Sequence, residues 1–357
     1  MANTYSNPVD ITVEMSPSFT SASLNKCAII TKEHKTVGGD NSKDEIAVFS
    51  SSKEVGEAFG NNSKTFKAVE FFLGQMRYPA KQPLIPTFFT VISLKSDSAV
   101  NKASVLAALN GIGAGAQFYA MTDILDDGEL AEGDLNSWIN ENRKVYFNEN
   151  TTKTTSEEHR SPRLISIYNA KHTDGDDRQY KAAAYMATCI TPGAGSKSDM
   201  NILTMCSADI MGGERQTLTA QNLNFTERRT SKDYVVARMG VGTDGTDITE
   251  TTALDCIIYN LNDNLEIAMA ETGFKLDDRG IELLEDTISK VMGEMYNMGL
   301  VADENGQAAF KILPTEITEI DRQLKRIKPR VLFVLGEFAK TINLTLERTY
   351  GKIGGAN

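Results

Sequence analysis

The sequence predicts an α/β (α+β) fold with two domains, on three observations. Short apolar runs alternate with segments of helical periodicity over residues 27–94 and again over residues 104–206. Strands separated by helices are typical of an α/β layer in which some strands pair in parallel. The chain of 357 residues is also long enough for two hydrophobic cores. We place the domains at residues 25–210 and 211–340, with an N-terminal arm at 1–24 and a C-terminal strand arm at 341–357.

The first domain consists of alternating predicted strands and helices. Ser51 and Glu54 have the spacing of a capping box, which marks the start of a helix. Up to residue 94 the expected elements are strands at 27–31 and 46–49, helices from Ser51 to Gly60 and from Ser63 to Pro79, and a strand at 88–92. Further on we expect a helix at 105–109, a strand at 117–122, a helix at 130–142, strands at 144–147 and 163–168, a helix at 177–189 and a strand at 201–206.

A glycine-rich run, Gly240-Val241-Gly242-Thr243-Asp244-Gly245, has the spacing G-x-G-x-x-G and follows a predicted strand pair at 216–226 and 233–239. A dinucleotide fingerprint needs a helix that begins inside these glycines, so that its N-terminus faces the pyrophosphate. Here the helical pattern begins only at Thr252, and the next element is again helical. The run therefore favours a glycine-rich hairpin or loop over a nucleotide site.

The last quarter of the chain has a pattern typical of strand pairing. Asn305-Gly306, the strongest short hairpin signal, lies between apolar residues 300–302 and 308–312. Two amphipathic helices are expected here, one carrying Ile281, Leu284, Ile288, Val291, Met292 and Met295 and ending at Gly299, the other carrying Ile317, Ile320, Leu324 and Ile327 and ending at Pro329.

Two strands are predicted after the second helix. The first is apolar on both faces, which predicts a buried strand, and consists of Val331, Leu332, Phe333, Val334 and Leu335. In the second, one face is apolar and the other polar, and its residues are Ile342, Asn343, Leu344, Thr345, Leu346, Glu347 and Arg348. No later segment can pair with this last strand, so its edges need a partner from elsewhere.

An isolated alternating segment near the N-terminus lies between Pro8 and Pro17 and consists of Ile11, Thr12, Val13, Glu14 and Met15. It is too far from the next predicted strand to form a local hairpin. Two interpretations stay open: a disordered tail, or a strand added to a sheet of this molecule or of a neighbour.

Composition and charge argue against several classes of function. The net charge of −11 argues against a general binder of nucleic acid or anionic membranes, since both need a basic surface. No apolar run approaches the about 20 residues that span a bilayer, and the N-terminus lacks the apolar stretch of a signal peptide. The cysteines Cys27, Cys189, Cys206 and Cys256 show no C-x-x-C spacing, which favours reduced thiols over disulfides or a zinc site.

No catalytic constellation stands out in the sequence. The histidines His34, His159 and His172 lie in predicted loops, and no nucleophile elbow, H-E-x-x-H motif or P-loop is present. The acidic loop at 174–177 lacks the remaining ligand positions of a calcium loop, so a solvated loop is the better interpretation. We therefore predict no enzyme activity, no cofactor and no metal, although an enzyme without a known motif stays open.

Two groups of residues carry a resemblance to a known family. The first is Asn297-Met298-Gly299-Leu300, Asp321-Arg322, Pro329, Val331 to Leu335 and Gly336, followed by the final alternating strand. The second is Ser51, Glu54, Val55, Phe59 and Gly60, then Lys67, Ala68, Phe71, Phe72 and Gln75. This sequence resembles bacteriophage contractile tail sheath proteins, and more closely the sheath-like tail proteins that were long a phage domain of unknown function.

The resemblance implies a structural role. Many copies would form a helical sleeve around a tail tube and contract to drive the tube through a bacterial envelope. The domain at 25–210 would be the outer domain and the one at 211–340 the inner domain. Residues 11–15 and 342–348 would be arms that add strands to the inner sheets of other copies, drawn from residues 300–312 and 331–335.

The implied partners are other copies of the chain, the tail tube protein, and baseplate and tail terminator proteins, with no nucleic acid and no membrane insertion. The implied location is the virion tail, assembled in the host cytoplasm. Two alternatives stay open. One is a non-contractile tail or virion subunit, and the other is a nucleotide-binding enzyme, for which a helix would have to start at Gly242.

Overall fold

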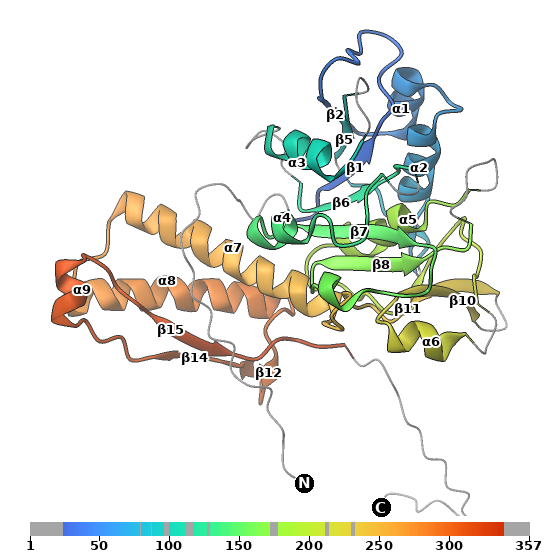
Figure 1. Ribbon diagram of the computed structural model, residues 1–357. Coiled ribbons are helices and arrows are strands. Elements are labelled where there is room, and N and C mark those ends of the chain that lie inside the picture. The colour runs from blue at the N-terminus through green and yellow to red at the C-terminus, as the bar shows by residue number, and fades with distance from the viewer. Residues whose placement is uncertain are drawn as a thin grey trace, which may run out of the picture.

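The computed structural model describes residues 24–338, apart from 79, 87, 96–99, 112–117, 127–128, 172–177, 211–213 and 230–232. The predicted arms at 11–15 and 342–348 lie outside the described residues. A six-stranded sheet has the order β2-β5-β1-β6-β7-β8 (Figure 1). All neighbouring strands pair in parallel except β2, which is antiparallel to β5. The strands are β1 (Cys27–Thr31), β2 (Glu45–Phe49), β5 (Phe89–Ser93), β6 (Ala120–Asp123), β7 (Val145–Asn150) and β8 (Leu164–Tyr168).

Helices cover both faces of this sheet, which explains why every residue of the inner strands β1 and β5 is buried. On β1, Ile29 faces one hydrophobic cluster and Ile30 faces the other, as expected from the alternation of side chains along a strand. The first cluster contains residues of α1 (Ser52–Phe59), α2 (Lys64–Leu73) and α5 (Lys181–Ile190). The second contains residues of α3 (Lys102–Gly111) and α4 (Asn136–Glu141). The α/β alternation predicted from the sequence is therefore confirmed for this part of the chain.

A second sheet has the order β10-β11-β9 and lies beside β8. Its strands are β9 (Asn201–Ile202), β10 (Phe225–Arg229) and β11 (Tyr234–Arg238). The strand predicted at 216–226 is wrong in its first half, where α6 (Arg215–Ala220) forms instead. Leu218 on α6 and Leu223 after it are buried together with Phe225, so a helix and a turn bury the residues that suggested a strand.

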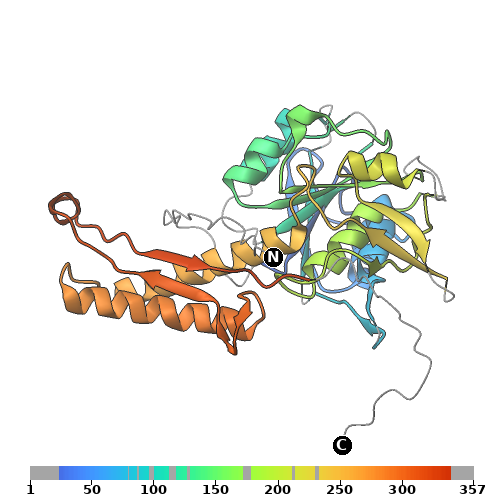
Figure 2. The same cartoon turned by 90° about the horizontal axis from the view of Figure 1, so that it is seen from below.

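Two long helices, α7 (Ile248–Glu271) and α8 (Asp278–Asn297), extend away from the six-stranded sheet (Figures 1 and 2). Asp247 and Asp277 cap them by accepting hydrogen bonds from the first-turn N–H groups of Thr249 and Gly280. The buried residues of α7 all lie between Ile248 and Asn262, and none lies in its last nine residues. On α8, five of the apolar residues predicted for it are buried, namely Leu284, Ile288, Val291, Met292 and Met295.

The remaining elements are short. A two-stranded sheet of β14 (Phe310–Leu313) and β15 (Arg330–Phe333) lies along α8 (Figure 2). The hairpin predicted at Asn305-Gly306 is confirmed, with positive φ at both residues, between β12 (Asp303–Glu304) and β13 (Gln307–Ala308). The others are β3 (Met76–Arg77), β4 (Gln82–Pro83) and the 3-10 helix η3 (Glu157–His159).

Two predicted helices are much shorter than expected. Residues 130–142 contain only α4, which begins at Asn136. The amphipathic helix expected between Pro314 and Pro329 is only α9 (Glu319–Gln323). Its predicted apolar face is not buried as a unit, because Ile327 packs on the core while Ile320 and Leu324 are exposed.

We call residues 24–262 the body and residues 263–338 the lobe. The two share one hydrophobic cluster, which runs from Ile29 and Phe147 of the sheet to Ile257 of α7 and Leu284 of α8. The boundary predicted at residues 210 and 211 stays a prediction.

Candidate functional site

The two-stranded sheet of the lobe is the candidate site, because no other described strand pairs with either of its edges. β14 and β15 run antiparallel, with Phe310 opposite Phe333 and Ile312 opposite Val331. The segment predicted at 331–335 therefore pairs with part of 300–312, the other segment predicted for the same sheet. We call residues 300–302, 309–313 and 330–336 the lobe sheet.

One strand of the lobe sheet is interrupted by the β12–β13 hairpin. Val301 bridges Leu335, two residues beyond the Phe310–Phe333 pair. Residues 300–302 and 309–313 therefore lie end to end along the same side of residues 330–336. The hairpin between them leaves this side, and the N–H of Ala309 donates to the carbonyl of Ala302 at 2.9 Å to close the gap.

The other side of residues 330–336 has no strand beside it in the described part of the chain. The N–H of Val334 donates to Ala309, and its carbonyl accepts from Ala302 at 2.8 Å, so both groups of Val334 face the paired strand. Backbone groups alternate in direction along a strand. Val331, Phe333 and Leu335 therefore direct their N–H and C=O groups to the free edge. By the same alternation, Phe310 and Ile312 expose theirs at the opposite edge.

One face of the lobe sheet packs on the core, and this leaves the edges accessible. Phe310, Ile312, Val331, Phe333 and Leu335 are half-buried against the hydrophobic cluster that includes α8. Val334, on the other face, is 42% exposed. The prediction of a fully buried strand at 331–335 is thus wrong. A two-stranded sheet is at best marginally stable by itself, so α8 supports the pair and further strands would stabilise it.

Two glycines, Gly299 and Gly336, allow two backbone segments to lie very close together at the end of the lobe sheet. A Cβ on Gly336 would lie 2.3 Å from the carbonyl oxygen of Gly299. Gly299 itself ends α8 with φ of 79°, a conformation that favours glycine. The end of α8 and the end of β15 can therefore approach each other closely, which fixes the lobe sheet against α8.

A buried ion pair fixes α7, and through it the lobe, to the body. Asp255 of α7 is fully buried and accepts two hydrogen bonds of 2.6 Å from the guanidinium of Arg163, beside β8. The hydroxyl of Tyr119, before β6, donates to the same carboxylate at 2.7 Å. Burial, followed by the charge of Asp255, raises the pKa of Tyr119 well above its usual value, so the phenol stays protonated and donates.

The sequence analysis missed this ion pair. The available signal was a single carboxylate inside the apolar run Ala253-Leu254-Asp255-Cys256-Ile257, since a charge is rarely buried unless it is paired.

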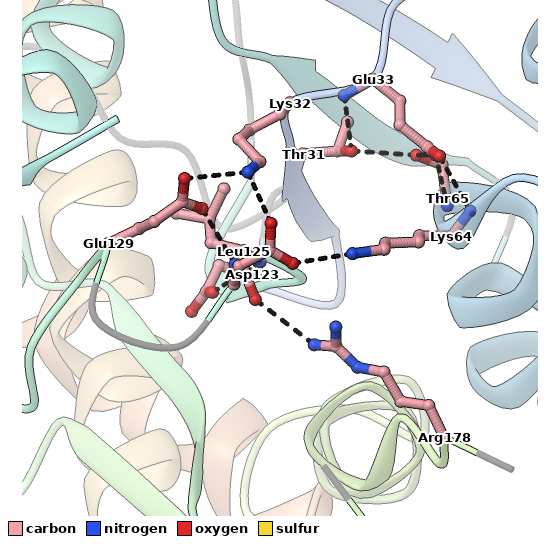
Figure 3. Close-up of polar contacts among 10 residues, drawn as sticks. Thr31, Lys32, Glu33, Lys64, Thr65, Asp123, Leu125, Glu129 and Arg178 are labelled. Carbon is pink, nitrogen blue, oxygen red and sulfur yellow. Dashed lines mark hydrogen bonds and ion pairs between the residues drawn. The ribbon is translucent and has the colours of Figure 1, made fainter. Parts of the chain in front are cut away.

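A second candidate position lies at the carboxyl ends of β1 and β6. Because β5 and β6 flank β1, the chain changes direction there, and open α/β sheets usually bind ligands at such a switch point. Here the protein's own side chains occupy it (Figure 3). Lys32 contacts Asp126 and Glu129 at 2.6 and 2.8 Å, and Lys64 contacts Asp126 at 2.7 Å.

The N-terminus of α2, at the same position, is also occupied. The carboxylate of Glu33 accepts hydrogen bonds from the N–H groups of Lys64 and Thr65, at 3.0 and 2.7 Å, and from the Thr65 hydroxyl at 2.6 Å (Figure 3). A helix N-terminus is a ready anion site, and in this protein an internal carboxylate fills it. These contacts give the switch point a structural role.

The glycine-rich run at 240–245 also has a structural explanation. α7 begins at Ile248, with Asp247 as its cap, and not at Gly242 as a dinucleotide fingerprint requires. A Cβ on Gly242 would lie 2.8 Å from the carbonyl oxygen of Ser161, so this glycine permits close packing of two backbones. The N–H of Thr243 donates to Leu164 at 2.9 Å, which attaches the loop to the start of β8.

Within the described residues, no helix is long and apolar enough to cross a membrane. The same part of the chain contains no group of three or more His, Cys, Asp or Glu side chains arranged to hold a metal ion. All four cysteines are free and buried.

Comparison with known proteins places the fold. The sequence matches no protein-family model and no curated protein sequence. The structure is similar to a chain of the contracted helical sheath of the anti-feeding prophage, with a TM-score of 0.71, 13% identity, and coverage of 97% of this chain and 100% of that chain. A chain of the anti-feeding prophage baseplate structure gives a TM-score of 0.73 and 11% identity, with the same coverage. The sheath tail protein of Listeria innocua gives 0.57 and 8%, with coverage of 81% and 88%.

The first two likenesses extend over nearly the whole chain, and at such identities all three show a shared fold. The resemblance to contractile tail sheath proteins predicted from the sequence is confirmed at that level.

Proposed function

We propose that this protein is the structural subunit of a phage-like contractile tail sheath. Copies would polymerise as a helical sleeve around a tail tube and contract to drive the tube through a bacterial envelope. The observation that carries the proposal is the full-length fold likeness to a chain of a contracted helical sheath. A role of this kind needs no catalytic residue. It is consistent with a switch point that the protein's own ion pairs fill.

In the proposed assembly, the lobe sheet receives strands from other copies. The free edge at Val331, Phe333 and Leu335 offers three N–H and three C=O groups, and main-chain pairing of this kind tolerates changes in side-chain packing. The proposed arms have the matching alternation. Ile342, Leu344 and Leu346 would continue the apolar face over α8, and Ile11, Val13 and Met15 would do so at the other edge. The proposed inner domain, 211–340, then carries the assembly contacts, and 25–210 is the outer domain.

The proposed partners follow from this role. They are other copies of the chain, a tail tube protein, and baseplate and tail terminator proteins, and the proposed location is the virion tail. Stored energy would lie in an extended lattice whose contracted packing buries more surface.

Electron microscopy of the purified protein, over a range of concentration and salt, tests the proposal. We expect hollow helical tubes with a lumen wide enough for an inner tube. A uniform population of monomers or small closed oligomers at high concentration would contradict the sheath role.

Deletion of residues 1–16 tests the arm. We expect a folded, soluble protein with an unchanged circular dichroism spectrum that forms no tubes, because the strand it would lend is missing. Unfolding of the truncated protein would instead mean that this segment is an internal strand.

A further inference from the structure

The short helix α9 has its polar and apolar sides reversed relative to an ordinary surface helix. The only buried residue in it is Asp321, whose carboxylate accepts hydrogen bonds from the Thr318 hydroxyl and from Arg326 Nε at 2.7 Å. Ile320 and Leu324, one turn apart, are 62% and 57% exposed. A surface helix normally buries its apolar face and exposes its charges. The apolar face of α9 is therefore available to a partner.

The chain around this face is strongly basic. Residues 322–330 contain five cations and no carboxylate, in a protein of net charge −11, and all five are exposed: Arg322, Lys325, Arg326, Lys328 and Arg330. Lys325 makes no ion pair with any residue in the described ranges. Apolar side chains surrounded by cations fit a partner surface that combines carboxylates with an exposed apolar residue. We call residues 319–328 the α9 surface.

The exposed side of α8 has this composition. Asp278, Glu282 and Asp286 recur every four residues and form an acidic stripe, and Leu283 beside them is 38% exposed. None of the three carboxylates forms an ion pair with a described residue. Both surfaces are solvent-exposed in a single copy, so α9 does not cover the stripe of its own chain.

We infer that the α9 surface of one copy docks on the α8 acidic stripe of the next copy. The inference rests on the proposed function and adds a second contact to the strand exchange at the lobe sheet. The two surfaces consist of different residues, although Arg322 of α9 donates to the carbonyl of Leu276 just before α8 in the same chain at 2.9 Å. The contact between copies is therefore heterologous, and heterologous contacts build open helical polymers when they do not close into a ring.

Charge reversal on each side, alone and combined, tests this contact in the full-length chain. One variant carries Lys325→Glu and Lys328→Glu, a second carries Glu282→Lys and Asp286→Lys, and a third carries all four changes. The assay is the concentration at which tubes first sediment, with electron microscopy to confirm their form. A matched control, Lys43→Glu with Lys53→Glu, makes the same charge change on exposed lysines of the body.

Each two-residue reversal is expected to raise the critical concentration about tenfold, because like charges then face each other across the contact. The four-residue variant is expected to return to within about twofold of the unmodified chain, since the pairing is restored with opposite signs. The control variant is expected to stay near the unmodified value. Thermal unfolding of the dilute chain verifies that every variant is folded.

Normal assembly of both two-residue variants, or failure of the four-residue variant to recover, would overturn the inference while leaving the proposed function intact. The first result would assign the α9 surface to a different acidic protein. Absence of tubes from the unmodified chain would instead overturn the proposed function, and this contact with it.

Discussion

The six-stranded sheet and the lobe sheet differ at one edge each. The β8 edge of the first is covered by another segment of the chain, and the β15 edge of the second has no described strand beside it. In the six-stranded sheet, the edge strand β8 is covered by the chain entering β10. The N–H of Tyr168 donates to the carbonyl of Asn224 at 2.7 Å, and the N–H of Asn224 donates to Ser166 at 2.9 Å. In the lobe sheet, the backbone groups of Val331, Phe333 and Leu335 that point away from β14 pair with no residue in the described ranges. Exposed edges invite pairing with other chains, and most proteins protect them. The β8 edge follows that rule, and the lobe sheet departs from it where the proposed assembly needs a strand to add.

The largest expected effect comes from Asn224→Ala, which removes the side chain that holds the covering segment against β8. The fully buried Asn224 side chain donates to the carbonyls of Ser166 and Val241 and accepts from the N–H of Val241. Loss of these bonds leaves buried polar groups unpaired, so the free energy of unfolding should fall by about 3 kcal/mol.

Urea denaturation checks this prediction. Asn264→Ala, which removes a half-buried amide that donates only to a carbonyl of its own helix α7, is the matched control and should change the free energy by less than about 0.5 kcal/mol. Equal effects of the two substitutions would mean that Asn224 does not stabilise the β8 edge.

Proline substitutions at two neighbouring residues compare the two edges of β15, the one that pairs with β14 and the free one. Leu332→Pro removes an N–H that faces β14 and should lower stability by about 1–3 kcal/mol. Val331→Pro removes an N–H that faces the free edge, so we expect a change below about 1 kcal/mol.

The two proline variants should differ in assembly as well as in stability. Val331→Pro should remain folded and form no tubes, as measured by thermal unfolding and sedimentation. Tube formation by a folded Val331→Pro variant would show that this edge does not receive a strand.

The smallest effect concerns pH and the ion pairs at the switch point. Hydrogen bonds from Lys32 and then Lys64 lower the pKa of Asp126 from 3.8 to about 2. A carboxylate whose pKa is lowered by folding stabilises the protein above its unfolded pKa, and this stability is lost as the pH falls from about 4 to about 2.

The difference in unfolding free energy between the unmodified chain and Asp126→Asn should therefore be about 1 kcal/mol or less at pH 6 and should vanish toward pH 2, because the pairs are partly exposed. Denaturation at several pH values measures it. A difference that stays constant over this range would assign the effect to something other than the charge of Asp126.

The α/β alternation of the body could be predicted because local patterns decide it: β1, β5 and β8 are short segments of mostly apolar residues, and Ser51 and Ser63 cap the helices that follow. The predictions failed where a local pattern fits two structures. In 216–226, where a strand was expected, a helix followed by a turn buries Leu218, Leu223 and Phe225.

The candidate site could be predicted only in part for a related reason. An apolar segment at 331–335 indicates that both of its faces need a partner, but the sequence does not say whether that partner belongs to the same chain. The strand was expected to be buried, and it is half-exposed with a free edge. The Asp255–Arg163 pair joins residues 92 positions apart, a distance over which no local pattern operates.

The buried ion pair on α7 limits how far the lobe can move relative to the body. α7 has 24 residues, and its last ten residues span about 15 Å at 1.5 Å per residue. If this segment tilted by about 10° where it leaves the body, its far end would move by about 2.5 Å. Backbone hydrogen bonds accept a range of donor–acceptor distances of only about 0.5 Å, so such a movement would break strand pairing. Arg163 lies just before β8 and Tyr119 just before β6, and both bind Asp255 in the buried part of α7. Two contacts from different directions limit how far the helix can tilt. The orientation of the free edge of the lobe sheet therefore depends on contacts in the body, far from the strands that would pair with that edge.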